Sequence, residues 1–315
     1  MRFATIACLL FVLLAAARTA QAQTGAPAPE RVSVLTMGPG DHPFARFGHN
    51  ALLVEGPGRR ALVYNFGTFA FDGLQGVEDF MAGRFRYWLS VSTLARTERF
   101  YRSQDRSMVA QELNLSALER AELGRALELN AQPDNRFYDY DYYYDNCSTR
   151  VRDVVARTLG GELERSLQGP GRFSFREHTE RLTADAPWLY FGLDLALGPL
   201  TDRPITRWEE LFIPDELHAA LGKATRVKDG RVVPVVQAER VLLTSARPPS
   251  RSAPPSRVPV FAALGLGLGG VLGVLGRLGR HSGTARIAYG LCAALIGLLG
   301  GLLGTIFGVF WLFTK

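Results

Sequence analysis

Two long apolar stretches near the C-terminus constrain most strongly what this 315-residue chain can fold into. The first, Val258–Gly276, has 19 residues and would form a helix about 28 Å long, which matches the hydrocarbon core of a bilayer. The second, Ile287–Phe313, is long enough to span a bilayer with some tilt. The short, basic segment between them, Arg277–Arg286, lies in the cytoplasm by the positive-inside rule. We therefore predict two transmembrane helices that hold the preceding chain outside the cytoplasm.

Glycine recurs every four residues in both apolar stretches. Small residues at this spacing let helices approach closely, so we expect the pair to pack as a hairpin or onto a partner. The glycines concerned are Gly265, Gly269, Gly273, Gly300, Gly304 and Gly308.

The first 22 residues have the features of a secretory signal peptide. A short basic start is followed by the apolar run Ala4–Ala17 and by the small-x-small cleavage site Ala20–Ala22. Export agrees with the orientation of the two spans. The predicted organisation is a signal peptide (residues 1–22), a periplasmic domain (23–245), a linker rich in proline, serine and arginine (246–257), a transmembrane helix (258–276), a cytoplasmic loop (277–286) and a second transmembrane helix (287–313).

The formal net charge is +6, and only three of the 36 basic residues are lysine. The positive charge is spread along the chain, with no basic block interleaved with aromatic residues, so the sequence has no nucleic-acid footprint. Attraction to anionic lipid surfaces is the more natural consequence of this charge.

Short alternating segments indicate strands in the exported domain. Arg31–Met37 and Arg84–Val91 alternate apolar and polar residues, and a Gly/Pro turn joins Phe47–Val54 to Ala61–Phe66 as a hairpin. A capping box at Ser116–Glu119 predicts a helix. The fold class that follows is α+β, with a small mixed or antiparallel sheet.

One polar turn carries the strongest sign of chemistry. The tyrosine-rich segment Tyr138–Tyr144 leads to Asp145 or Asn146 as a helix cap, and Cys147 lies where the helix begins. Backbone N–H groups and the helix dipole favour a thiolate there, whereas the charge of Asp145 opposes it. A lone cysteine also serves as a small buried apolar residue.

Export makes the catalytic interpretation of Cys147 stronger. After signal cleavage only Cys147 and Cys292 remain, and Cys292 lies in the second apolar stretch. Exported proteins normally pair their cysteines or avoid them, so a free cysteine at a helix start suggests use. We predict that Cys147 is a nucleophile, and that its backbone N–H donates to the oxyanion.

A nucleophilic cysteine needs a base and a group that orients the base. His49 begins an apolar strand and is the preferred base, with His42 as the alternative. The neighbouring strand offers Asn65 or Tyr64 as the orienting residue, and Asn65 is preferred. His178 and His218 lie in charged or polar segments and are expected on the surface.

Four residues are assigned as candidate substrate contacts. Tyr142 and Tyr143 have apolar bodies and polar tips that suit an acyl groove, although ordinary core packing explains them equally well. Asn146 adjoins the thiol, and Arg176 suits a phosphate or carboxylate, with a plain salt bridge as its alternative. No cofactor and no metal are predicted, since the nearby aspartates lack the glycine and the glutamate of a calcium loop.

Six segments together resemble the family of the Lnb N-terminal periplasmic domain. They occur in the family's order over roughly Val32–Leu221, and the block around Asn146-Cys147 is the specific one. The segments are Phe47–Leu53, Tyr64–Gly67, Leu113–Leu115, Tyr138–Asp153, Phe173–Glu177 and Phe212–Leu217.

The resemblance implies a permuted papain-like domain in which the histidine precedes the cysteine, as in lecithin–retinol acyltransferases. It also implies a thiol acyltransferase of the bacterial inner membrane that faces the periplasm and moves an acyl chain from a phospholipid to a lipoprotein N-terminus. Cys147 is then the nucleophile and His49 the base. The membrane region here has two spans, whereas family members often have a longer one. Two alternatives stay open: a papain-like peptidase or amidase, and a non-catalytic membrane-tethered binding module.

Overall fold

A seven-stranded antiparallel sheet is the centre of the domain in the computed structural model, which describes residues 29–70 and 86–313. The predicted signal peptide lies outside the described residues. The strand order is β6-β4-β3-β2-β1-β5-β9. The strands are β1 (Arg31–Met37), β2 (His49–Glu55), β3 (Leu62–Thr68), β4 (Arg86–Thr93), β5 (Met108–Leu113), β6 (Phe137–Asp139) and β9 (Val236–Leu243). The predicted α+β class is confirmed, and of the two kinds of sheet left open, mixed or antiparallel, the structure has the antiparallel one.

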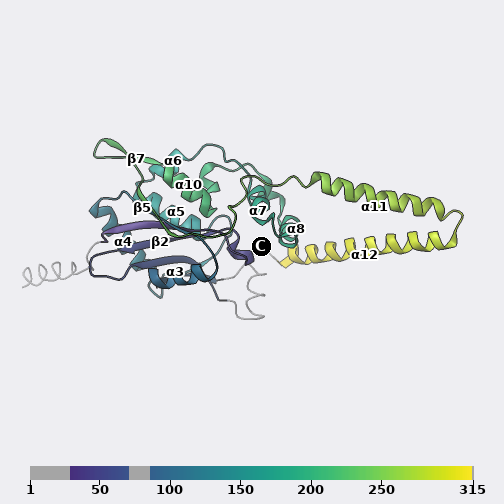
Figure 1. Ribbon diagram of the computed structural model, residues 1–315, viewed down its shortest axis with the longest axis horizontal. Helices are drawn as coiled ribbons and strands as arrows, with labels where there is room; N and C mark the ends of the chain where they lie inside the picture. Colours follow the sequence, from purple (N-terminus) through teal and green to yellow (C-terminus); the bar gives the residue numbers. More distant parts are fainter. Residues whose placement is uncertain (1–28, 71–85, 314–315) are drawn as a thin grey trace, which may run out of the picture.

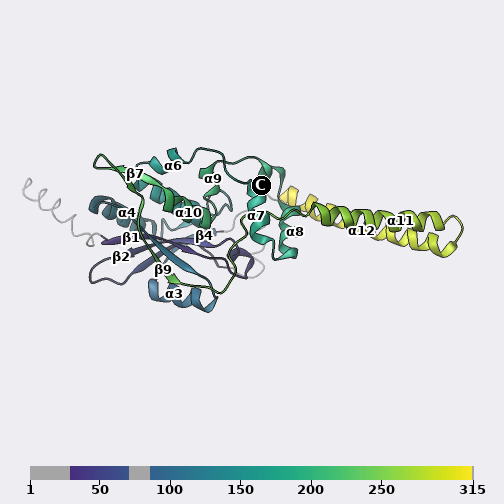
Figure 2. The same ribbon diagram turned by 45° about the horizontal axis from the view of Figure 1, so that its top comes forward.

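Helices cover both faces of this sheet (Figure 2). On one face α4 (Ala117–Asn130), α5 (Cys147–Thr158) and α10 (Pro214–Lys223) enclose the larger apolar core. On the other face Tyr101 of α3 (Leu94–Ser103) packs on the smaller core. Strand β1 lies between the two cores. Successive residues point to opposite faces of the sheet, so Val34 is fully buried in the larger core and Leu35 in the smaller one.

Shorter elements complete the domain. They are α6 (Glu162–Ser166), α7 (Phe175–Thr183), α8 (Pro187–Ala196) and α9 (Arg207–Glu210), the 3-10 turns η1 (Pro43–Ala45) and η2 (Pro199–Asp202), and the hairpin of β7 (Thr225–Lys228) and β8 (Arg231–Pro234). Figure 1 shows α7 and α8 at the end of the domain from which the two C-terminal helices project.

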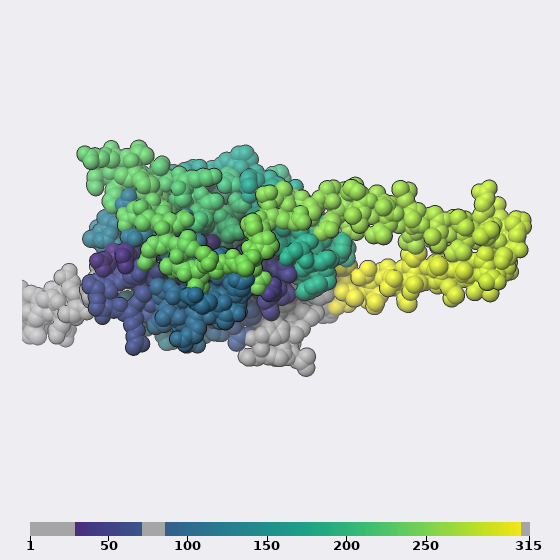
Figure 3. Space-filling model, viewed as in Figure 1, coloured from purple at the N-terminus to yellow at the C-terminus, as the bar shows by residue number. Residues whose placement is uncertain are grey.

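The two C-terminal helices, α11 (Val258–Leu278) and α12 (Gly283–Phe313), form a hairpin that extends away from the domain (Figures 1 and 3). Both are long and apolar enough to cross a membrane. Each helix continues into the predicted basic loop, which leaves a turn of only four residues, Gly279–Ser282.

The glycine stripes do not bring α11 and α12 together. No described atom outside each helix's own backbone lies within 4 Å of a Cβ added at any of the six predicted glycines. Within the described hairpin the close approaches are instead at Gly276, which faces Tyr289 at 3.5 Å, and at the turn residue Gly279. Of the two predicted roles, packing of the hairpin through these stripes is wrong, and packing on a partner stays a prediction.

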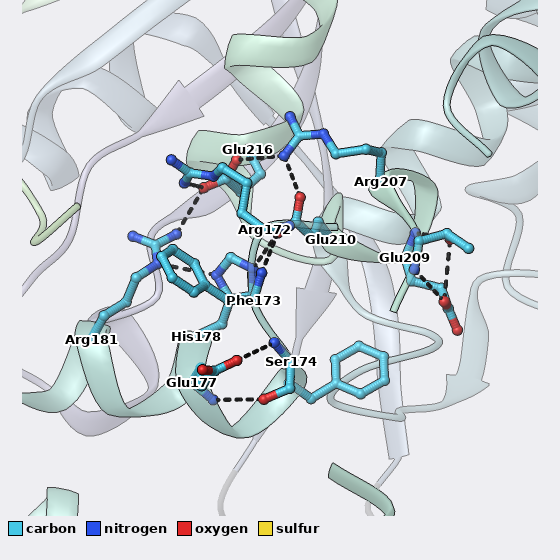
Figure 4. Close-up of polar contacts among 12 residues, drawn as sticks. Arg172, Phe173, Ser174, Glu177, His178, Arg181, Arg207, Glu209, Glu210 and Glu216 are labelled. Atoms are coloured by element: carbon cyan, nitrogen blue, oxygen red, sulfur yellow. Dashed lines mark hydrogen bonds and ion pairs between the residues drawn. The ribbon is translucent and has the colours of Figure 1, made fainter. Parts of the chain in front are cut away.

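A buried cluster of charges fastens α7, α9 and α10 to one another, and we call it the Glu210 cluster (Figure 4). The Glu210 carboxylate, fully buried, accepts from the backbone N–H of Phe173 at 3.0 Å and from His178 Nε2 at 3.0 Å. Arg181 Nε donates to His178 Nδ1 at 3.0 Å, and Arg181 Nη2 donates to Glu216 at 2.9 Å.

This cluster corrects the surface expectation for His178, which is 0% exposed. Local sequence around His178 is charged, and the carboxylate that makes its burial possible comes from α9, 32 residues later. A buried polar ring such as that of His178 is tolerated only where the protein supplies hydrogen-bond partners for it.

We expect Glu210→Gln to lower the free energy of unfolding by about 3 kcal/mol or more at pH 7, because it leaves buried donors and charges unpaired. Burial raises the pKa of Glu210, but the bonds from His178 and from the Phe173 and Arg172 amides outweigh it and hold the pKa below its usual value. The stabilisation is therefore present above the unfolded pKa of about 4.3 and is lost as pH falls through the lower folded pKa.

Urea unfolding of the detergent-solubilised full chain, as a function of pH, measures this effect. The matched control is Glu164→Gln, at an exposed carboxylate of α6. Equal stability losses in the two variants would contradict the role assigned to the Glu210 cluster.

Candidate active site

Cys147 is the first residue of α5, and Asn146 is the cap of that helix. Asn146 Oδ1 accepts from the N–H groups of Ser148 at 2.8 Å and Thr149 at 2.9 Å. Its Nδ2 donates to the carbonyls of Tyr142 at 2.8 Å and Phe212 at 3.0 Å. The amide therefore uses both lone pairs and both protons inside the protein. Asn146 positions the thiol, and no polar group of its side chain is left for the substrate contact that we predicted.

His49 opens β2 at the point where β2 separates from β3. The β2–β3 pairing begins only at Leu52 opposite Tyr64, so the backbones of His49 and Asn50 are not paired with β3. The pairing of β3 with β4 is also irregular between Asn65 and Thr68. The start of α5 lies at this separation, because Cys147 approaches both His49 and the backbone of Asn50.

Asn65 contacts His49 across the separation, with the Asn65 Oδ1 against His49 Nε2. The amide is oriented by its other end, since Nδ2 donates to Thr68 Oγ1 at 3.3 Å and Thr68 in turn bonds Ser90 at 2.6 Å. His49 Nε2 therefore carries a proton and donates it to Asn65. The other ring nitrogen, Nδ1, is the one left for the hydrogen bond with Cys147.

Gly67 lies next to Cys147 and His49, and its role was not predicted from the sequence. Its φ is +84°, a conformation that L side chains rarely adopt. A Cβ added there would lie 3.4 Å from Cys147 Cβ, 3.7 Å from His49 Cε1 and 4.0 Å from the Tyr138 hydroxyl. A glycine inside a strand, which signals a bulge or a close backbone approach, is the sequence feature that indicates such a position.

The electrostatics favour a thiolate–imidazolium pair. Burial raises the pKa of the Cys147 thiol, but the charge and hydrogen bond of His49 and the N–H groups of Asn50 and Ser148 bring the pKa below its usual value. Burial likewise lowers the pKa of His49, yet the Cys147 charge and the bonds to Cys147 and Asn65 raise it overall. Each group stabilises the charged form of the other.

Asp145 does not oppose the thiolate as its sequence position suggested. Both of its carboxylate oxygens accept from Arg150, each at 2.6 Å. The Arg150 guanidinium also lies 3.8 Å from the centre of the Tyr138 ring. This pair largely neutralises the nearest carboxylate to the thiol.

Three tyrosines, from β4, β6 and the turn before α5, lie beside the reactive pair. The rings of Tyr87 and Tyr140 stack at 4.0 Å, and Tyr138 lies 6.3 Å from Tyr87. Burial, followed by the charge of Cys147, raises the pKa of each of the three well above 10. The hydroxyls therefore keep their protons at neutral pH, and a Cβ added at Gly67 would lie within 4.0 Å of both the Tyr138 hydroxyl and Cys147 Cβ.

The other predicted residues lie away from the thiol or have structural partners. Tyr142 and Tyr143 belong to a separate aromatic cluster, with Tyr142 against Phe47 at 5.0 Å and Tyr143 against Phe175 at 4.5 Å. Arg176 donates to Asp194 and Asp202 and to the carbonyl of Leu197, and so fastens α8.

The alternative base and orienting residue are elsewhere. His42 precedes η1, where its ring lies 5.5 Å from Phe44, and Tyr64 is buried in the larger core.

Comparison with known proteins agrees with this architecture. The model of the Lnb N-terminal periplasmic domain family matches residues 18–180, about half of the chain. The match includes β1–β6, α5 and all the residues of the thiol site. No curated protein and no solved structure matches the chain.

We expect His49→Ala to raise the pKa of Cys147, since burial then acts without the opposing charge and hydrogen bond of His49. At a pH below the pKa of the thiol, each unit by which that pKa rises lowers the thiolate fraction about tenfold. Alkylation of Cys147 at pH 6 should therefore slow by at least about tenfold. Mass spectrometry of the Cys147 peptide after timed exposure to iodoacetamide measures this rate from pH 4 to 10. His42→Ala is the control, and an unchanged pH profile in His49→Ala would remove His49 from the pair.

Proposed function

This chain belongs to the Lnb N-terminal periplasmic domain family, and on that premise we propose that it is a membrane-anchored, cysteine-dependent acyltransferase. The observation that carries the proposal is the contact of the buried Cys147 with the half-buried His49, oriented by Asn65, in a domain that continues into two candidate membrane spans. The acyl donor is a phospholipid, and the acceptor is the amino terminus of a lipoprotein. The catalytic domain faces the periplasm from the inner membrane.

The arrangement supports a permuted papain-like assignment. A papain-type site places a thiol at a helix start against an imidazole and an amide carried by an antiparallel sheet. Here the sheet residues His49 and Asn65 precede Cys147 in the chain, which is the order expected of the permuted form.

The first half-reaction transfers the acyl chain to the enzyme. Cys147 Sγ attacks the ester carbonyl carbon of the phospholipid, so a carbon–sulfur bond forms and the ester carbon–oxygen bond breaks. His49 gives its proton to the departing glycerol oxygen, which leaves as a lysophospholipid. Donors at the start of α5, together with the protonated Tyr138 hydroxyl, stabilise the oxyanion.

The second half-reaction regenerates the thiol. The lipoprotein amine attacks the thioester carbon, His49 accepts the amine proton, and the carbon–sulfur bond breaks as the amide forms. The sulfur leaves as the thiolate, paired again with imidazolium. The same residues serve an amide-hydrolysing peptidase, and the anchor favours the acyltransferase because both of its substrates reside in the membrane.

Incubation of the full chain with phospholipid vesicles tests the proposal, with intact mass as the measurement. We expect an added acyl mass that hydroxylamine removes, that is absent from Cys147→Ser and that persists in Cys292→Ser. An adduct that never forms, while Cys147 still reacts with iodoacetamide and the protein cleaves peptides, would replace the acyltransferase by the peptidase. A Cys147 that neither acylates nor alkylates would indicate the non-catalytic module.

Asn65 provides a paired test of how the base is held. Asn65→Ala removes a bond that raises the pKa of His49, so the alkaline limit of acylation should move to lower pH. Asn65→Asp adds a negative charge and should move that limit to higher pH. The pH profile of adduct formation measures both, and shifts in the same direction would contradict an electrostatic role for Asn65.

A further inference from the structure

An apolar face of α8 is exposed in the domain. Trp188 is 68% exposed and Leu195 is 57% exposed, and Leu200 in the following η2 turn is 82% exposed. Trp188, Phe191 and Leu195 are spaced i, i+3 and i+7, so they lie along one side of the helix. The only charged residue in the ten residues of α8 is Asp194. A contiguous apolar face of this kind marks an interaction surface.

This face is continuous with the base of the membrane hairpin. The ring of Phe191 meets that of Phe261, in the first turn of α11, at 5.5 Å. Arg257, which immediately precedes α11, donates to the carbonyl of Ala184 at 2.9 Å. Figures 1 and 2 both show α8 beside the end of the hairpin that joins the domain. The helix therefore lies at the level at which α11 enters the bilayer.

Several polar groups at the two ends of α8 have partners within the protein. Arg176 neutralises Asp194 and donates to the carbonyl of Leu197 at 2.8 Å, next to the free C-terminal end of the helix. Arg257 also lies over the Tyr190 ring at 5.1 Å. A helix end without such partners is costly in a partly apolar medium, so these contacts suit α8 to the membrane interface.

We propose that α8 is an interfacial helix, with Trp188, Phe191 and Leu195 resting at the boundary between lipid headgroups and acyl chains. Tryptophan is enriched at this depth, and amphipathic helices bury an apolar face there. Arginines near the base of the hairpin, such as the exposed Arg251, add attraction to anionic headgroups. This assignment goes beyond the proposed function and does not depend on it.

Contact of α8 with lipid also orients the domain. Arg46, three residues before His49, donates to Asp185 in the turn before α8 at 2.6 Å. Phe47 in the same loop packs on Tyr142, near the start of α5. The end of the sheet that carries His49 is thus tied to the interfacial helix and is held toward the bilayer surface.

Quenching of tryptophan fluorescence by brominated phospholipid tests the placement of α8 in the full chain reconstituted in vesicles. The chain has four tryptophans, so the signal of Trp188 is the difference between the native protein and Trp188→Phe. In the Trp188→Phe background, Leu195→Trp puts a reporter on the same face. Leu129→Trp, at an α4 position that is 64% exposed, puts a matched reporter on a different helix.

We expect bromine near the headgroup end of the chains to reduce the signals of Trp188 and of the Leu195→Trp reporter by at least about twofold, as for side chains buried 5–10 Å into the boundary. The Leu129→Trp reporter should be unaffected, and bromine at the chain ends should quench the two α8 reporters less than bromine near the headgroups does. If the two α8 reporters are quenched no more than the α4 reporter, the face meets water, another protein or a second copy of this chain, and the proposal is wrong.

Discussion

The contact between Cys147 and His49 is the interaction on which the rest of the candidate site depends. Burial alone shifts both groups toward their neutral forms, so the pair depends on mutual charge and on backbone N–H groups at the start of α5. Because β2 separates from β3 here, the backbone N–H of Asn50 is able to donate to Cys147. Gly67 has no side chain, and a Cβ added there would contact Cys147. Pairing of Asp145 with Arg150 removes a charge that would oppose the thiolate.

A second set of buried charges links this site to the membrane anchor. The buried Glu210 cluster holds α7, and the partly exposed pairs of Arg176 of α7 hold α8 through Asp194 and η2 through Asp202. These contacts give the end of the domain next to α11 a defined shape. Under the proposed function both substrates reside in lipid, and these contacts would then hold the domain in a fixed orientation to the bilayer surface.

Local patterns predicted the elements well where a single segment contained the whole signal. The strand Arg31–Met37, the capping box at Ser116 and a helix beginning at Cys147 depend on neighbours within a few residues, and the structure has all three. The pattern was insufficient for His178, whose partner Glu210 lies in another helix. It was also insufficient for Asn146 and Arg176, whose hydrogen-bonding capacity is taken by backbone groups that become neighbours only on folding.

By itself the sequence determined the α+β class, the two apolar C-terminal helices, the family, and the candidates Cys147, His49 and Asn65, because periodicity, hydrophobic length and motif order are properties of the chain. Only the tertiary structure decided which nitrogen of His49 faces the thiol, that position 67 has the positive φ that favours glycine, and that the glycine stripes of α11 and α12 make no close contact with each other. Those outcomes depend on distances between segments far apart in sequence. They are set when burial forces each polar group to find its partner, a constraint that no local pattern records.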